Sequence, residues 1–170
     1  MTATNIDVGT NATIVTEADY GSQTVIGWDN PANATGVIKT AAIFYGSTNG
    51  LGVKVGCFYT GSVHPKYLYR AGATIGTVTK GSWQTFTGLS FAVTANDLCG
   101  YYSISGDLRC DHGGSCAHGE YLSGDHMKVE AEQTYTPEAV NWRCNIYLTG
   151  VTPSLIQSVP CIARIMLMST

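Results

Sequence analysis

Two thiols and two imidazoles fall within nine consecutive residues of this chain, at Cys110, His112, Cys116 and His118. Two cysteines and two histidines are one of the donor sets that hold Zn²⁺ tetrahedrally, so these side chains are a candidate structural zinc site. The spacing differs from that of established zinc fingers, and the glycines between the cysteines would let the two thiols meet. We therefore favour a disulfide between Cys110 and Cys116, with both histidines in solvent, and keep zinc as the alternative.

The cysteines form an even set of six: Cys57, Cys99, Cys110, Cys116, Cys144 and Cys161. An even number in a chain rich in glycine and threonine indicates an oxidising final environment, although sequence does not choose the pairing. Cys57 and Cys144 each fall on the apolar face of an expected strand, where they are either small core side chains or a bridge across the sandwich. Cys161 would close the C-terminal segment onto the body through Cys99.

Glycoside hydrolysis requires a pair of carboxylates, and the sequence contains two candidate pairs. Glu130 and Glu132 share the polar face of one expected strand, and Glu120 and Asp125 flank a turn. Neither pair has the apolar setting that an acid catalyst needs, so we expect solvated surface groups. The sequence also contains no Gly-x-Ser-x-Gly elbow and no glycine-rich phosphate loop. These features predict that the protein is not an enzyme.

Aspartates offer a second metal alternative. Calcium could use the carboxylates of Asp97, Asp107, Asp111 or Asp125, but their spacing follows neither an EF-hand nor an RTX repeat. We therefore predict no cofactor, with zinc and calcium as unsupported alternatives.

The net charge and the hydropathy of the sequence bear on two classes of partner, nucleic acids and membranes. The net charge is −3 and the nine lysines and arginines are scattered, which gives no electrostatic footprint for nucleic acid. No apolar run approaches the roughly 20 residues that a membrane-spanning helix requires. We expect neither nucleic-acid binding nor membrane insertion.

Aromatic side chains are the candidates for contact with sugars, because flat amphipathic rings suit the faces of sugar rings. An aromatic residue on a strand is more often part of the core or of a sheet face. Adjacent tyrosines on a strand point to opposite faces, so one of Tyr101 and Tyr102 points outward. The predicted glycan contacts are Tyr101, Tyr102, Tyr121, Trp28 and Trp83.

The secondary structure that positions these candidate residues is predicted to be β-strand. Only 12% of the residues are charged, and 21 threonines, 20 glycines and ten tyrosines favour pleated sheet with tight turns. Period-2 alternation over 140–149 places Cys144, Ile146 and Leu148 on one face, with Tyr147 and Thr149 opposite. Further strands are expected over 51–60, 127–133, 23–28, 36–45, 66–70, 74–79, 82–87, 90–94 and 98–104.

Turn signals separate these runs at spacings typical of an all-β sandwich or barrel. The prediction is an all-β, two-sheet antiparallel β-sandwich, jelly-roll-like, in one domain over residues 1–150. Residues 105–126 have little strand character and should form a long excursion, outside the sheets, at one end of the sandwich.

Residues 151–170 follow the stop at Thr149-Gly150 and carry an apolar run from Cys161. We expect a C-terminal strand of this domain, with an arm that adds to the sheet of a neighbouring subunit as the alternative. In the arm, Ile162, Ile165 and Leu167 would be the assembly contacts.

Several short sequence segments occur in a characteristic order along the chain. They are Ile6-Asp7-Val8-Gly9, the stretch from Asp29 to Gly36, Ile75-Gly76-Thr77-Val78-Thr79, Phe86-Thr87-Gly88-Leu89, Asp97-Leu98-Cys99-Gly100-Tyr101-Tyr102 and Gly124-Asp125. This order resembles jelly-roll-like β-sandwich modules of phage structural proteins and of large repetitive surface proteins from environmental microbes and viruses. The resemblance covers about residues 5–150 and implies a role in particle or filament surfaces, or in adhesion. The six cysteines depart from that pattern.

The expected function is that of a non-catalytic structural or assembly protein. It would be a subunit of a virion surface (decoration, tail or fibre) or of an extracellular filament, and would contact copies of itself or other structural subunits. The alternative is a carbohydrate-binding, lectin-like adhesion module that contacts surface glycans. Either function places the protein on a virion surface or outside the cell.

Overall fold

A computed structural model describes residues 4–10, 21–112, 119–137 and 142–153, with the backbone only for 110–112 and 142–144. All pairings between its strands are antiparallel. Sheet A has five strands, β1 (Asn5–Gly9), β14 (Ile146–Val151), β3 (Gly36–Phe44) and β6 (Trp83–Phe86) in that order, with β7 (Phe91–Val93) also on β3.

Sheet B has seven strands, in the order β11 (Gln133–Thr134), β5 (Lys66–Val78), β4 (Gly50–Thr60), β8 (Leu98–Ser103), β2 (Gln23–Gly27), β10 (Gly119–Ser123) and β12 (Thr136–Pro137). The remaining strands, β9 (Cys110–His112) and β13 (Trp142–Cys144), form a two-stranded ribbon.

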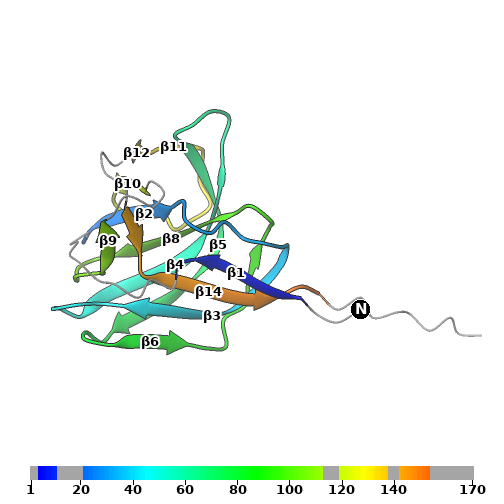
Figure 1. Ribbon diagram of the computed structural model, residues 1–170. Coiled ribbons are helices and arrows are strands. Elements are labelled where there is room, and N and C mark those ends of the chain that lie inside the picture. Colours follow the sequence, from blue (N-terminus) through cyan, green and yellow to red (C-terminus); the bar gives the residue numbers. More distant parts are fainter. Residues whose placement is uncertain (1–3, 11–20, 113–118, 138–141, 154–170) are drawn as a thin grey trace, which may run out of the picture.

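Sheet A lies against sheet B (Figure 1). The buried side chains of the two large sheets form the main core between them. Ile38, Ala41 and Ile43 of β3 share this core with Val53 and Val55 of β4, and all five are fully buried. Complete burial of such an isoleucine or valine contributes about 1.5–3 kcal/mol each. The core therefore follows the alternation of the sequence, and the two-sheet antiparallel prediction is confirmed.

Sheet B curls until its two edges are joined by one short segment, so that it is nearly closed into a barrel. β11 pairs with β5 at one edge, and β12, which begins two residues after β11 ends, pairs with β10 at the other. Tyr135 lies between these strands and is 2% exposed. Because the sheet is nearly closed, the strand order does not establish the jelly roll that the sequence led us to expect.

The inside of the curled sheet holds a second core, which is rich in aromatic rings. Its buried members are Ile26, Phe58, Tyr67, Leu98, Met127 and Tyr135. The ring of Tyr135 lies 5.5 Å from that of Tyr67 and 6.2 Å from that of Phe58, both edge to face. Such pairs add about 0.5–1.5 kcal/mol each beyond the area they bury.

Two glycines make room for these rings. Gly56 and Gly100 lie opposite each other on β4 and β8. A Cβ on Gly100 would lie 2.5 Å from the Phe58 ring, and one on Gly56 would lie 2.8 Å from the Tyr69 ring. The two glycines therefore leave the sheet without side chains at this point, and the aromatic rings lie against its backbone.

The run 140–149 was predicted as one strand, and this was wrong. β13 and β14 are separate strands in different sheets, with the buried Asn145 between them. The backbone N–H of Asn145 donates to Arg109, and its carbonyl accepts from Phe44. The chain therefore changes partner at this residue, from β9 to β3, which alternation alone does not reveal.

Other predictions along the chain were also wrong. The two strands expected over 66–70 and 74–79 form one strand, β5. Residues 127–132 form a loop, because the Met127 N–H donates to Asp125 (3.1 Å) and the His126 ring contacts Glu130 (2.5 Å). Within the 105–126 excursion, Gly119–Ser123 forms β10, a full member of sheet B.

Tyr135 should be essential for closure of the second core. We expect Tyr135→Ala to lower the free energy of unfolding by about 3–5 kcal/mol, as for other large-to-small changes in cores. Urea unfolding followed by circular dichroism measures it. Val129→Ala in the same loop is the control, because Val129 is 84% exposed and its truncation should change little. Equal effects of the two changes would contradict this role.

Candidate functional site

A shallow groove of about 530 Å³ crosses the outer face of sheet A. Ile146 and Leu148 of β14 face the core, so Tyr147 and Thr149 face outward. The groove is lined by Asn5, Ile6, Asp7, Asn33, Lys39, Tyr147, Thr149, Gly150 and Val151. Amide, carboxylate, ammonium and hydroxyl groups therefore line the groove together with one tyrosine.

Strand pairing fixes the polar groups of the groove. Asp7 lies opposite Thr149 on β14, and Thr149 lies opposite Thr40 on β3, where the two threonine hydroxyls are hydrogen bonded. The Tyr147 hydroxyl donates to an Asp7 carboxylate oxygen at 3.5 Å. Burial raises the pKa of Tyr147, and the neighbouring Asp7 adds to the effect, so the hydroxyl keeps its proton and remains a donor.

One asparagine anchors the end of the groove at the edge of β1. The Asn33 side-chain amide donates to the Asn5 carbonyl at 3.3 Å and accepts the Asp7 N–H at 3.2 Å. Its own backbone N–H donates to the Asp7 carbonyl at 3.4 Å. Asn33 therefore pairs with β1 as a short piece of strand would, and holds Asp7 in place.

The outer face of sheet A continues to a pair of aromatic rings on β3 and β6. Phe44 lies opposite Trp83, and their ring centroids are 5.8 Å apart. Phe44 follows the core residue Ile43, so its side chain points to the outer face. This face therefore carries polar groups at β1 and β14 and aromatic rings at β6.

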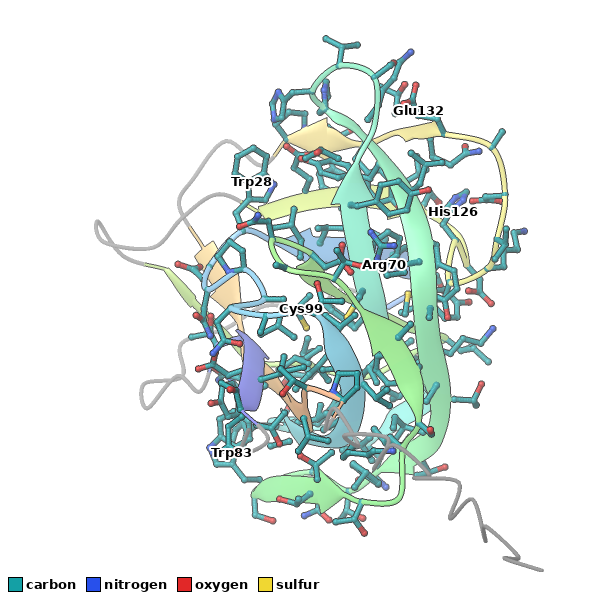
Figure 2. The ribbon with its side chains drawn as sticks, turned by 90° about the vertical axis from the view of Figure 1, so that its right-hand side faces the viewer. Trp28, Arg70, Trp83, Cys99, His126 and Glu132 are labelled. Carbon is teal, nitrogen blue, oxygen red and sulfur yellow. The ribbon has the colours of Figure 1, made fainter. Side chains whose placement is uncertain are left out.

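The five predicted glycan contacts do not share one face. Trp28 and Trp83 lie at opposite ends of the molecule (Figure 2). Tyr101 is 1% exposed in the main core, Tyr121 is partly buried against it, and the Tyr102 ring lies 6.0 Å from the Lys54 ammonium. Of the five, only Trp83 lies on the outer face of sheet A. Sequence reasoning did not single out Asp7, Asn33 or Lys39.

A buried carboxylate lies at one end of the curled sheet B. Glu120 of β10 is 1% exposed, which corrects the expectation of a solvated group. One carboxylate oxygen lies 2.7 Å from His64 Nε2, and the Tyr67 hydroxyl is a second polar neighbour of this carboxylate. The Trp28 ring packs edge to face against both His64 and Tyr67. Burial and the adjacent Glu120 raise the pKa of Tyr67, which keeps its hydroxyl protonated beside the carboxylate.

The other predicted acids each have partners of their own. Asp97 is paired with Arg70 and accepts the Thr94 N–H at 2.7 Å. Asp125 is paired with Lys54, and Asp107 accepts the hydrogen bonds of Ser47. The structure does not describe the side chain of Asp111. Among the described residues, no three histidines, cysteines, aspartates or glutamates are grouped so as to hold a metal ion.

The predicted acid pairs are also separated. Glu130 contacts His126, whereas Glu132 accepts from Ser62 at 2.8 Å and lies 3.3 Å from the Lys66 ammonium. Burial alone would raise the pKa of Asp125, but hydrogen bonds from Lys54 and the Met127 N–H outweigh it and hold that pKa below its ordinary value. These carboxylates serve as partners for nearby loops.

The cysteines are arranged differently from the predicted pairs. Cys57 and Cys99 are buried free thiols, and Cys57 packs in the main core, which is one of the two alternatives left open by the sequence. The other alternative, a bridge from Cys57 to Cys144, is not seen. Cys110 is a register partner of Cys144. Cys116, His118, Cys161, Ile162, Ile165 and Leu167 lie outside the described residues, as do the zinc and assembly predictions that depend on them.

The chain matches no family model and no curated protein. Over the residues that the structure describes, no helix is long and apolar enough to cross a membrane.

The buried Glu120 should depend on His64. Replacing His64 with alanine should lower the free energy of unfolding by about 1–3 kcal/mol, because the carboxylate then loses its donor. Adding Glu120→Gln should restore part of the loss, because an unpaired amide is less costly to bury than a carboxylate. Urea unfolding of the wild type, both single variants and the double variant gives the coupling.

The control is Val63→Ala in the same loop, where the side chain is 59% exposed. Strictly additive effects of the two substitutions would show that the pair does not interact.

Proposed function

We propose that the protein is a non-catalytic binding module that holds carbohydrate on the outer face of sheet A. The observation that supports this most directly is the groove around Tyr147, with Asp7, Asn33, Lys39 and Thr149 along it. Sugars present many hydroxyls and one or two apolar C–H faces. Hydrogen-bonding side chains beside an aromatic ring suit that combination.

The charges of the groove fit a neutral ligand. Asp7 and Lys39 both line it, one acidic and one basic, so neither an anion nor a cation is favoured overall. A polyhydroxylated ligand can both donate to the carboxylate and accept from the ammonium group. The Phe44–Trp83 pair extends the same face and would contact a longer chain of sugars.

A non-catalytic role is supported by the environment of the acids. Among the described carboxylates, Asp97 and Glu120 are the most deeply buried, and they pair with Arg70 and His64. Neither lines the groove. A glycosidase would need two carboxyl groups that face each other across its substrate. The residues that line the groove include one acid, Asp7.

Removal of the Tyr147 ring should weaken glycan binding. We expect Tyr147→Ala to raise the dissociation constant of a glycan found by array screening about 10-fold, which corresponds to about 1.4 kcal/mol. Asp7→Asn should weaken binding as well, because it removes a charged acceptor. Isothermal titration calorimetry measures both.

The matched control is Tyr59→Ala, a tyrosine that is also half-buried but lies on sheet B with Arg70 over its ring at 4.6 Å. Its affinity should equal that of the wild type. An array without any bound glycan, or an equal loss in the control, would refute the carbohydrate proposal.

A second candidate is a structural subunit, in a jelly-roll-like sandwich of a virion surface (decoration, tail or fibre) or extracellular filament. The observation that favours it is β6, which ends the strand order of sheet A and has no further partner among the described strands. An open edge accepts a strand from another subunit through backbone hydrogen bonds. The apolar run of the C-terminal sequence, with Ile162, Ile165 and Leu167, would supply that strand.

Removal of the C-terminal sequence tests this second function. We expect deletion of residues 154–170 to convert oligomers to monomers in light scattering, with the β-type circular dichroism unchanged, because β14 already ends at Val151. Changing Ile162, Ile165 and Leu167 to asparagine should have the same effect without shortening the chain. An unchanged mass in both variants would refute the arm.

A further inference from the structure

Cys57 and Cys99 lie opposite each other on the neighbouring strands β4 and β8. Both are members of the main core, so their side chains point to the same face of sheet B. Opposed residues of an antiparallel pair have Cα atoms about 4.5–5.5 Å apart. That separation falls inside the range of about 4.4–6.8 Å that a disulfide spans.

A second pair of cysteines is opposed along the backbone of neighbouring strands. Cys110 of β9 and Cys144 of β13 are register partners in the two-stranded ribbon. The ribbon is short, three residues in each strand, and a pairing of that length has little stability of its own. A covalent link between its strands would supply the stability that the hydrogen bonds do not.

We propose that the oxidised protein carries two cross-strand disulfides, Cys57–Cys99 and Cys110–Cys144. The thiols of Cys57 and Cys99 in the structure then represent the reduced form of the first bridge. This pairing replaces the Cys110–Cys116 bridge favoured from the sequence, and it leaves Cys116 and Cys161 outside the two cross-strand links.

Each bridge forms by thiol–disulfide exchange with a small disulfide such as oxidised glutathione. One protein thiolate attacks a glutathione sulfur, and the first glutathione leaves as a thiol. The second protein thiolate then attacks the mixed disulfide and releases the second glutathione. Two protein thiols become one disulfide, and the two electrons and two protons pass to the two glutathione thiols.

Burial sets the time at which the first bridge can form. Burial raises the pKa of the Cys99 thiol to about 12 and also raises that of Cys57, so the reactive thiolate is scarce in the folded protein. The cavity beside Cys99 has a volume of about 10 Å³, enough for one water molecule and far too small for glutathione. The Cys57–Cys99 bridge therefore forms before β4 and β8 are covered, and it is then protected from reductants.

Peptide mapping of the full chain, refolded with reduced and oxidised glutathione, tests the first bridge. Free thiols are alkylated and the protein is digested with trypsin without reduction. Trypsin places Cys57 in peptide 55–66 and Cys99 in peptide 81–109. We expect mass spectrometry to find these two peptides linked. Alkylated Cys57 and Cys99, or a link from either to another cysteine, would overturn the proposal.

The second bridge needs a variant, because the tryptic peptides 110–128 and 144–164 contain two cysteines each. In the double variant Cys116→Ser, Cys161→Ser, the same digestion should join them through Cys110 and Cys144. If both cysteines are alkylated instead, the ribbon bridge does not exist. In the wild type, a Cys110–Cys116 bridge would appear as a loop within peptide 110–128 and would likewise contradict it.

Protection of the first bridge gives an independent readout. Dithiothreitol without denaturant should leave peptides 55–66 and 81–109 linked, whereas dithiothreitol in urea should separate them. The double variant Cys57→Ala, Cys99→Ala should lower the Tm by roughly 10 °C relative to the oxidised wild type, from the chain entropy of the loop it closes. Equal Tm values would contradict a bridge in the wild type.

Discussion

Closure of sheet B around its aromatic core is the constraint on which the rest of the molecule depends. The residues that join its edges, 133–137, place Tyr135 against Phe58 and Tyr67. The curl gives sheet B two packed faces, one against sheet A and one around the rings. Among the described residues, sheet A packs on one face, and its other face carries the groove around Tyr147. The proposed binding surface is therefore a consequence of how the opposite sheet is closed.

Alternation predicted strands where a run of residues stays in one sheet along its whole length. β3 and β4 lie where the sequence placed them, and Val53, Val55 and Cys57 face the core as expected. The prediction failed at Asn145, where the chain changes partner without a break in alternation. It also failed at 127–132, because side-chain hydrogen bonds there stabilise a loop that has the polarity pattern of a strand.

The groove could be predicted only in part. The alternation of 140–149 already placed Tyr147 and Thr149 on the face opposite the core. Their grouping with Asp7 depends on the pairing of β1 with β14, which joins the two ends of the described chain and leaves no local signal. The buried Glu120 escaped prediction for the same reason, since its burial comes from His64 and Tyr67, residues far away in the sequence.

The pairing of β1 and β14 also has a consequence for synthesis on the ribosome. β3 needs β14 as its neighbour, and β14 is among the last segments of the described chain to be made. Until then the nascent chain exposes one edge of β3 and the apolar side chains that later meet Ile146 and Leu148. Such a chain stays aggregation-prone during most of its translation. Its yield in a cell should therefore depend on chaperones that cover unpaired strands.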